Sequence, residues 1–270
     1  MKHIYVHSNR PGERVLFPHQ KLVLIITVAL SALILPASLY AFDFSLWDGI
    51  LKQNTRRSTY TGITYSGVDY AAIRNSKEFV KLVADLEVFS PDTLQGRDEK
   101  MAFWINAYNI FAINLVRENF PVRGIKDVGS IFSPVWVVKA GKVGGKPYSL
   151  DYIEHKLLRP MDEPGIHFAI VCASVSCPDL RTEAYQASSL QAKLKSQLNE
   201  FLDNTGKGMR MDPGTKTVYL SRIFDWYEKD FEQAGGIINF INRNRGNSQA
   251  IPTDYSVKFL PYNWDLNSIR

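Results

Sequence analysis

The chain has 270 residues, of which 32 are lysine or arginine and 27 are aspartate or glutamate, so its formal net charge at pH 7 is +5. Residues 1–41 hold four basic residues and one acidic residue, and without them the charge falls to +2. A charge this small argues against a nucleic-acid partner. The length of the remaining chain fits one globular domain with a sizeable core.

The first 41 residues have the three parts of a secretory signal peptide. A basic, polar stretch precedes the uncharged apolar run 22–35, and small residues follow up to Ala41. The run is shorter than the ~20 residues of a membrane span. We therefore expect cleavage near Ala41 and an exported protein, periplasmic or extracellular, with no stable membrane span after cleavage. An uncleaved anchor is the alternative, because apolar character returns at Leu39, Tyr40 and Phe42.

Two helices are predicted in the first half of the chain. Residues 43–66 mix aromatic and polar side chains and are expected to form a wrapping arm. Apolar residues three and four positions apart then predict a helix over 68–86 and a clearer one over 101–116, which Pro121 closes.

The long predicted helix contains three asparagines, Asn106, Asn109 and Asn114. Helix interiors disfavour asparagine because its amide competes for backbone hydrogen bonds. The three amides therefore need partners. Either they bind nearby backbone or water, or Asn106 or Asn109 orients a catalytic group.

The middle of the chain is predicted to alternate between short strands and a helix. Residues 131–148 favour a β-hairpin around a Gly-Gly turn, because they are rich in β-branched and aromatic side chains. Ser149 is placed to cap the next helix, which carries Glu154 and His155. Residues 166–172 are short, apolar and bounded by turn signals, as expected of a buried strand.

The last third repeats this mixture. It predicts a helix over 188–202, a hairpin over 208–220, an aromatic-rich helix capped by Ser221, a short helix over 237–241 and a strand over 256–260. Helices and hairpins alternate without a regular βαβ order. The predicted fold class is therefore α+β, a single domain with a mostly antiparallel sheet and packed helices.

Both cysteines, and the two histidines outside the predicted signal peptide, lie in the segment from His155 to Cys177. Proline favours the first position of a helix, so Pro178 places Cys177 at a helix cap, where free amides and the helix dipole stabilise a thiolate. His167 is the candidate general base. The side chains available to orient its imidazole are Glu154, Asn106, Asn109 and Asp151.

Two other interpretations of these residues stay open. Cys172 and Cys177 can form a structural disulfide in an oxidising compartment, although it closes few residues and stabilises little. Zinc bound by the two cysteines, His155 and His167 would need a spacing looser than that of usual structural sites. We therefore predict no metal and no cofactor.

Several ordered motifs between residues 97 and 267 together resemble the domain of unknown function 547 family. They lie at 103–109 (FWINAYN), 149–155 (SLDYIEH), 167–169 (HFA), 172–178 (CASVSCP), 220–221 (LS), 226–231 (WYEKDF) and 262–267 (YNWDLN). The resemblance implies that Glu154, His155, His167, Cys177 and the Asn106/Asn109 pair occur together. The resemblance implies a family domain at 97–267, and with the segments read from the residues it divides the chain into the signal peptide 1–41, an N-terminal arm and helix at 42–96, and this domain.

The family name implies no activity. A papain-like or transglutaminase-like fold is suggested by analogy, but here histidine precedes cysteine, the reverse of the papain order. The hypothesis is a cysteine-dependent hydrolase or acyltransferase that acts on an amide or ester bond of a peptide or another cell-envelope component. Cys177 attacks, His167 takes its proton, and Glu154 or Asn106 orients the ring. The alternative is a non-catalytic envelope binding or structural module with inert or disulfide-bonded cysteines.

Overall fold

The computed structural model describes residues 41–245 and 250–270. The predicted signal peptide lies outside the described residues, except for Ala41 at its predicted end. Among the helices that are described, none is both long and apolar enough to cross a membrane.

The region expected to be an arm is a helix followed by a hairpin. Helix α1 (Ser45–Asn54) buries Trp47 and Leu51 against the core. Strands β1 (Thr55–Tyr60) and β2 (Ile63–Val68) pair antiparallel. The sequence did not indicate these two strands, because polar side chains such as those of β1 face solvent on a strand that is only half covered.

The helix predicted over 68–86 is two helices, α2 (Tyr70–Arg74) and α3 (Lys77–Val88). Asp69 caps the start of α2, and the break follows because the side chain of Ser76 accepts a hydrogen bond from the Phe79 N–H and caps the start of α3. After the short turn η1 (Pro91–Thr93) comes the longest helix, α4.

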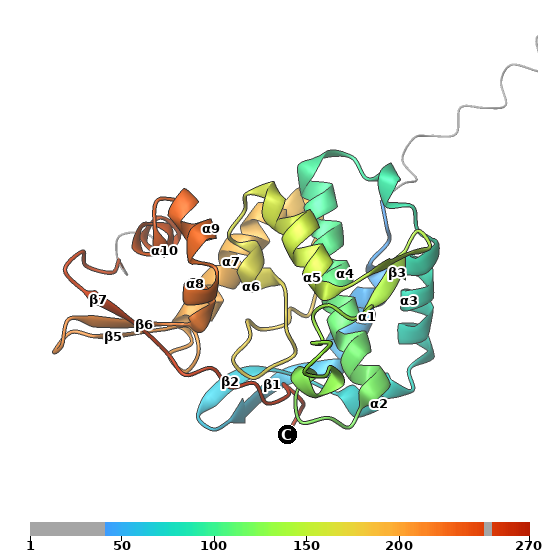
Figure 1. Ribbon diagram of the computed structural model, residues 1–270, viewed down its shortest axis with the longest axis horizontal. Coiled ribbons are helices and arrows are strands. Elements are labelled where there is room, and N and C mark those ends of the chain that lie inside the picture. Colours follow the sequence, from blue (N-terminus) through green and yellow to red (C-terminus); the bar gives the residue numbers. More distant parts are fainter. Residues whose placement is uncertain (1–40, 246–249) are drawn as a thin grey trace, which may run out of the picture. The chain divides into compact units, whose positions relative to one another are not determined.

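Helix α4 (Gly96–Asn119) confirms the clearest helical prediction. Every residue from Met101 to Val116 is buried, so the helix is covered on all sides and the larger hydrophobic cluster forms around it. A helix in this position fixes what packs against it. Figure 1 shows α4 running beside α5, the short helix that directly precedes the turn carrying Glu154 and His155.

The middle segment is built from short elements. They are η2 (Ile125–Val128), β3 (Gly141–Val143), β4 (Lys146–Tyr148), α5 (Leu150–Tyr152), a wide π-helical turn η3 (Ile153–Leu158) and η4 (Arg159–Met161). The predicted hairpin exists only over 141–148, because residues 131–140 find no partner strand, and Ile131 and Phe132 are 94% and 98% exposed.

Two predictions around the cysteines were wrong. Residues 166–172 do not form a strand, since helix α6 (Ile166–Ala169) occupies their first half. A short apolar run does not distinguish a buried strand from a buried helical turn. No helix begins after Cys177, and residues 178–186 are irregular. The next helical elements are η5 (Ala187–Ser189) and α7 (Leu190–Asp203), the latter as predicted.

The C-terminal part forms a three-stranded sheet with helices beside it. The strands are β5 (Met209–Asp212), β6 (Thr217–Leu220) and β7 (Ser256–Phe259), with β5 antiparallel and β7 parallel to β6. The helices are α8 (Arg222–Trp226), α9 (Glu228–Gln233) and α10 (Ile237–Arg245). Figure 1 shows this sheet in orange and red next to α8. With it, the α+β class is confirmed.

Helix α6 joins the two hydrophobic clusters. Its Ile166 and Ala169 belong to the cluster around α4, whereas Phe168 belongs to a second cluster with Phe224 and Phe231. His167 lies on the same short helix and is therefore fixed at the junction of the two clusters.

Candidate functional site

A cavity of about 360 Å³ contains most of the residues that the sequence singled out. Six of its fifteen lining residues are tryptophan or tyrosine, and aromatic side chains of this kind are common in small-molecule sites. The lining residues are Tyr108, Trp136, Asp151, Glu154, His155, His167, Ile170, Cys172, Cys177, Pro178, Ile223, Trp226, Tyr227, Tyr262 and Trp264. The structure therefore brings together Glu154, His155, His167 and both cysteines, and leaves Asn106 out.

Glu154 and His155 enter the cavity from the wide turn η3. The side chain of Ser149 accepts a hydrogen bond from the Tyr152 N–H (3.1 Å), as the sequence predicted, and starts this helical segment. The backbone then widens into π-helical geometry, which occurs mostly as local turns at functional sites. The turn buries the Glu154 side chain, which is 8% exposed.

The imidazole of His167 is hydrogen-bonded to a carboxylate through one of its two ring nitrogens. Its side chain is 1% exposed, and Nε2 lies 2.8 Å from Oδ2 of Asp230. Since a carboxylate accepts hydrogen bonds, Nε2 carries the proton and Nδ1 carries the lone pair. The ring also stacks on Tyr227, with ring centroids 3.8 Å apart. Asp230, and not Glu154 or Asn106, is therefore the group that orients the imidazole.

Asp230 is fixed in turn by a bidentate ion pair. Arg159 donates to both carboxylate oxygens, Nε to Oδ2 at 2.7 Å and Nη2 to Oδ1 at 2.6 Å. Burial raises the pKa of Asp230, but the hydrogen bonds from His167 and Arg159 outweigh it and hold the pKa well below its ordinary value. Asp230 stays charged, so it keeps His167 in one tautomer.

Two buried atoms facing each other in the cavity have no hydrogen-bond partner among the described residues. They are Nδ1 of His167 and Oε1 of Glu154, which lie 3.9 Å apart. The other oxygen of Glu154 lies 3.5 Å from the Tyr108 hydroxyl. Burial, and then the charge of Glu154, raise the pKa of Tyr108 and of Tyr227 well above the ordinary value, so both hydroxyls remain protonated.

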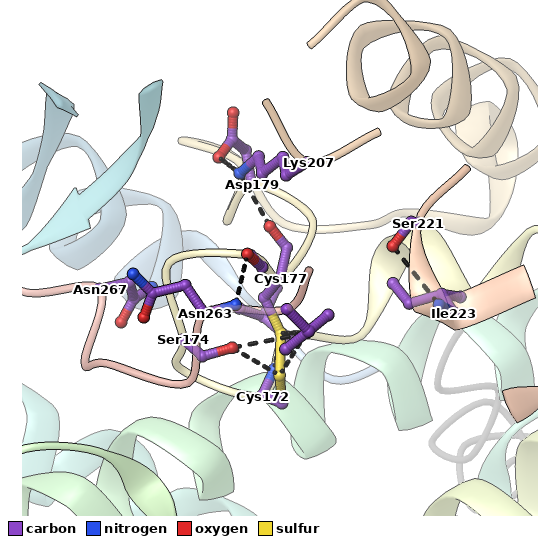
Figure 2. The surroundings of a disulfide bond; sticks show 12 residues. Cys172, Ser174, Cys177, Asp179, Lys207, Ser221, Ile223, Asn263 and Asn267 are labelled. Atoms are coloured by element: carbon purple, nitrogen blue, oxygen red, sulfur yellow. Dashed lines mark hydrogen bonds and ion pairs between the residues drawn. A yellow bond between two sulfur atoms is a disulfide. The ribbon is translucent and has the colours of Figure 1, made fainter. Parts of the chain in front are cut away.

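The cysteines are joined. Cys172 and Cys177 form a disulfide, drawn in Figure 2, so of the three interpretations of the cysteines the structure contains the disulfide. In this form the prediction of a Cys177 nucleophile at a helix cap does not hold, because the sulfur is bonded and no helix follows. The donors near the Cys177 sulfur are instead the Cys172 N–H at 2.8 Å and the Tyr262 hydroxyl at 3.4 Å.

A buried lysine fixes the Cys177 backbone. Lys207 is 2% exposed, and its ammonium donates to the Cys177 carbonyl (2.8 Å) and to the Asp179 carboxylate (2.5 Å), as Figure 2 shows. Burial lowers the pKa of Lys207 although Asp179 opposes the shift. Sequence reasoning missed both Lys207 and Asp230. The only sequence feature that could have pointed to Asp230 is its position as an acidic residue within the aromatic segment 226–231.

The asparagines of α4 have structural partners. Asn106 donates to the Tyr185 carbonyl (2.8 Å) and accepts from the Tyr185 N–H (3.0 Å). Asn109 does the same with the Ala169 carbonyl (3.0 Å) and the Val171 N–H (2.8 Å). The assignment of Asn106 to the catalytic group was therefore wrong, since both ends of its amide are used by backbone.

The zinc interpretation lacks its ligands. Both sulfurs are consumed by the disulfide, and within residues 41–245 and 250–270 no group of three or more histidine, cysteine, aspartate or glutamate side chains has the arrangement to hold a metal ion. His155 instead accepts from Arg159 at Nδ1 (2.9 Å) and faces Asp151 with Nε2 (3.6 Å).

These features define an α+β domain with a buried histidine, a glutamate and a disulfide around one aromatic cavity. Residues 91–202 match the model of a family described as "Protein of unknown function, DUF547", which confirms the family resemblance for this part of the chain. The matched range contains Glu154, His167, Cys172 and Cys177, and it stops before Asp230. Comparisons with curated proteins and with solved structures gave no match.

Proposed function

We propose that the cavity is the active site of a cysteine-dependent hydrolase or acyltransferase of the cell envelope, acting on an amide or ester bond, with the disulfide as its resting form. One observation carries the proposal. His167 is oriented by Asp230 through Nε2, and its Nδ1 has no hydrogen-bond partner among the described residues in a cavity that Cys177 also lines. Structural histidines normally have both ring nitrogens satisfied.

Activation requires a reductant. A dithiol exchanges with the Cys172–Cys177 bond, is itself oxidised to a disulfide, and leaves two cysteine thiols. The Cys172 N–H and the Tyr262 hydroxyl, which already point at the Cys177 sulfur, then stabilise a thiolate there. His167 takes the proton of Cys177 at Nδ1.

The chemical step is acyl transfer. The Cys177 sulfur attacks the carbonyl carbon and a thioester forms, while the C–N or C–O bond breaks and the leaving group takes its proton from His167. Water then releases the acid in a hydrolase, or an amine or alcohol accepts the acyl group in a transferase. Glu154 lies 3.9 Å from His167 Nδ1, where its charge favours the imidazolium that forms during attack.

The second candidate is a non-catalytic binding module. The disulfide itself supports it, together with the 3% exposure of Cys177. In that case the bond closes the 172–177 loop and the cavity binds a ligand without reaction.

Alkylation separates the two candidates. Cys172→Ser frees Cys177 without any reductant, and Cys177→Ser frees Cys172 as the matched control. In the full chain, iodoacetamide is expected to alkylate Cys177 about tenfold or more faster than Cys172 at pH 7, measured by mass spectrometry of the peptides. Equal, slow labelling of the two variants would remove the nucleophile and leave the binding module.

A further inference from the structure

Four aromatic side chains form a continuous surface along the cavity, called here the aromatic platform: Trp136, Trp226, Tyr262 and Trp264. Trp226 and Trp264 stack, with ring centroids 5.5 Å apart and planes 27° apart. Tyr262 packs against both, at 4.8 Å and 4.6 Å, and Trp136 lies 6.2 Å from Trp264. The platform brings together the end of α8, the segment after β7 and the segment before β3.

Part of the platform is exposed to solvent, although large aromatic side chains are normally buried in a folded protein. Trp226 is 43% exposed, although burial of a tryptophan is strongly favourable. The other three rings, Trp136, Tyr262 and Trp264, are half-buried. The exposed ring therefore marks the face where a ligand enters.

Charge restricts the class of ligand. Among the described residues, the carboxylates of Asp151 and Glu154 line the cavity and no lysine or arginine does, so a phosphate or another anion is disfavoured inside it. A cationic ligand competes with a cation already in place, because the Lys126 ammonium lies 3.4 Å from the centroid of the Trp264 ring. The remaining class is a neutral ligand with an apolar face and several hydroxyl groups.

We propose that the aromatic platform binds a sugar ring, and that the substrate of the cavity is an acylated sugar or glycan. The C–H face of a pyranose is flat and carries partial positive charge, so it stacks on the electron-rich faces of Trp226 and Tyr262. Its hydroxyl groups meet Asp151 and His155, which are 43% and 33% exposed at the side chain and accept or donate hydrogen bonds.

That the bound sugar is a substrate rests on the proposed function, because its acyl group would be the one that Cys177 attacks. The binding itself needs no reduced cysteine. Tyr262 connects the aromatic platform to the disulfide, since its ring belongs to the platform and its hydroxyl lies 3.4 Å from the Cys177 sulfur.

The test is a titration of the oxidised full chain with a trimer of N-acetylglucosamine, which has both a pyranose face and an amide. Tetramethylammonium chloride, adenosine monophosphate and N-acetyl-phenylalaninamide are titrated in parallel as cationic, anionic and peptide-like probes. Intrinsic tryptophan fluorescence and calorimetry report binding. We expect the trimer alone to bind, and Trp226→Ala to weaken it about tenfold.

The matched control is Tyr152→Ala, which removes an aromatic residue that is 48% exposed and does not line the cavity. It is expected to leave binding unchanged. Saturation-transfer NMR on the unmodified chain is a second measurement that needs no variant, and it should show contact on one face of the sugar ring.

Binding of another probe in place of the trimer, no binding at all, or equal losses in the two variants would overturn the sugar assignment. Failure of the cysteine alkylation leaves these results untouched, so the two proposals fail separately.

Discussion

Two sets of buried polar side chains differ in how they are satisfied. On α4, Asn106 and Asn109 each use both ends of the amide on backbone groups, and they have no polar atom left over. In the cavity, His167 and Glu154 each leave one buried atom without a hydrogen bond in the described part of the chain. A closed set stabilises the fold, whereas an open set costs stability and is retained where a ligand or a reaction completes it.

The largest effect is expected where the closed set is broken. Asn109→Leu leaves the Ala169 carbonyl and the Val171 N–H without their partners, and should lower the free energy of unfolding by about 3 kcal/mol. Urea denaturation followed by circular dichroism measures it. Asn114→Ala is the matched control, because among the described residues its amide hydrogen-bonds only with the side chains of Glu118 and Arg117, and it should cost less than about 1 kcal/mol. Similar losses in the two variants would contradict the distinction between backbone and side-chain partners.

An intermediate effect is expected at Asp230, and it should depend on pH. Asp230→Asn removes the charge that Arg159 and His167 bind, at a cost of about 2 kcal/mol at pH 7. The pKa of Asp230 is lowered in the folded state, so its contribution is fully present above the ordinary pKa of 3.8 and is lost as the pH falls below that value. The difference in unfolding free energy between the two proteins should stay constant from about pH 7 to 5 and shrink below about pH 4. A difference that grows on acidification would have the wrong sign.

The smallest effect on stability is expected at Glu154, in the open set. Glu154→Gln removes a charge from a site 8% exposed and leaves the shape unchanged, so the free energy of unfolding should stay within about 1 kcal/mol or rise. Denaturant unfolding at pH 7 measures it. A loss as large as that of Asn109→Leu would place Glu154 in the closed, structural set.

The sequence predicted the fold best where one element carries its own signal. Helices α4 and α7 and the β5–β6 hairpin follow from apolar spacing and turn residues within a single segment. The strand expected at 166–172 did not form, because its apolar residues are buried equally well as helix α6.

The site was predicted only in part. Scarcity of histidine and cysteine pointed to His167 and Cys177, but their partners come from distant segments. Asp230 lies 63 residues from His167 and Lys207 lies 30 residues from Cys177, and neither separation leaves a local pattern. The partners of the α4 asparagines are also set by tertiary packing. For the same reason a buried amide in a sequence does not show whether it is structural or catalytic.

The most direct test of the open site is the pH dependence of Cys177 alkylation in Cys172→Ser, compared with the Cys172→Ser/His167→Gln double variant. We expect rapid labelling at pH 7 in the first protein, about tenfold slower labelling in the second, and convergence of the two rates at high pH, where the thiol ionises without a base. Profiles that superimpose over the whole range would contradict it, because His167 would then have no influence on the Cys177 sulfur.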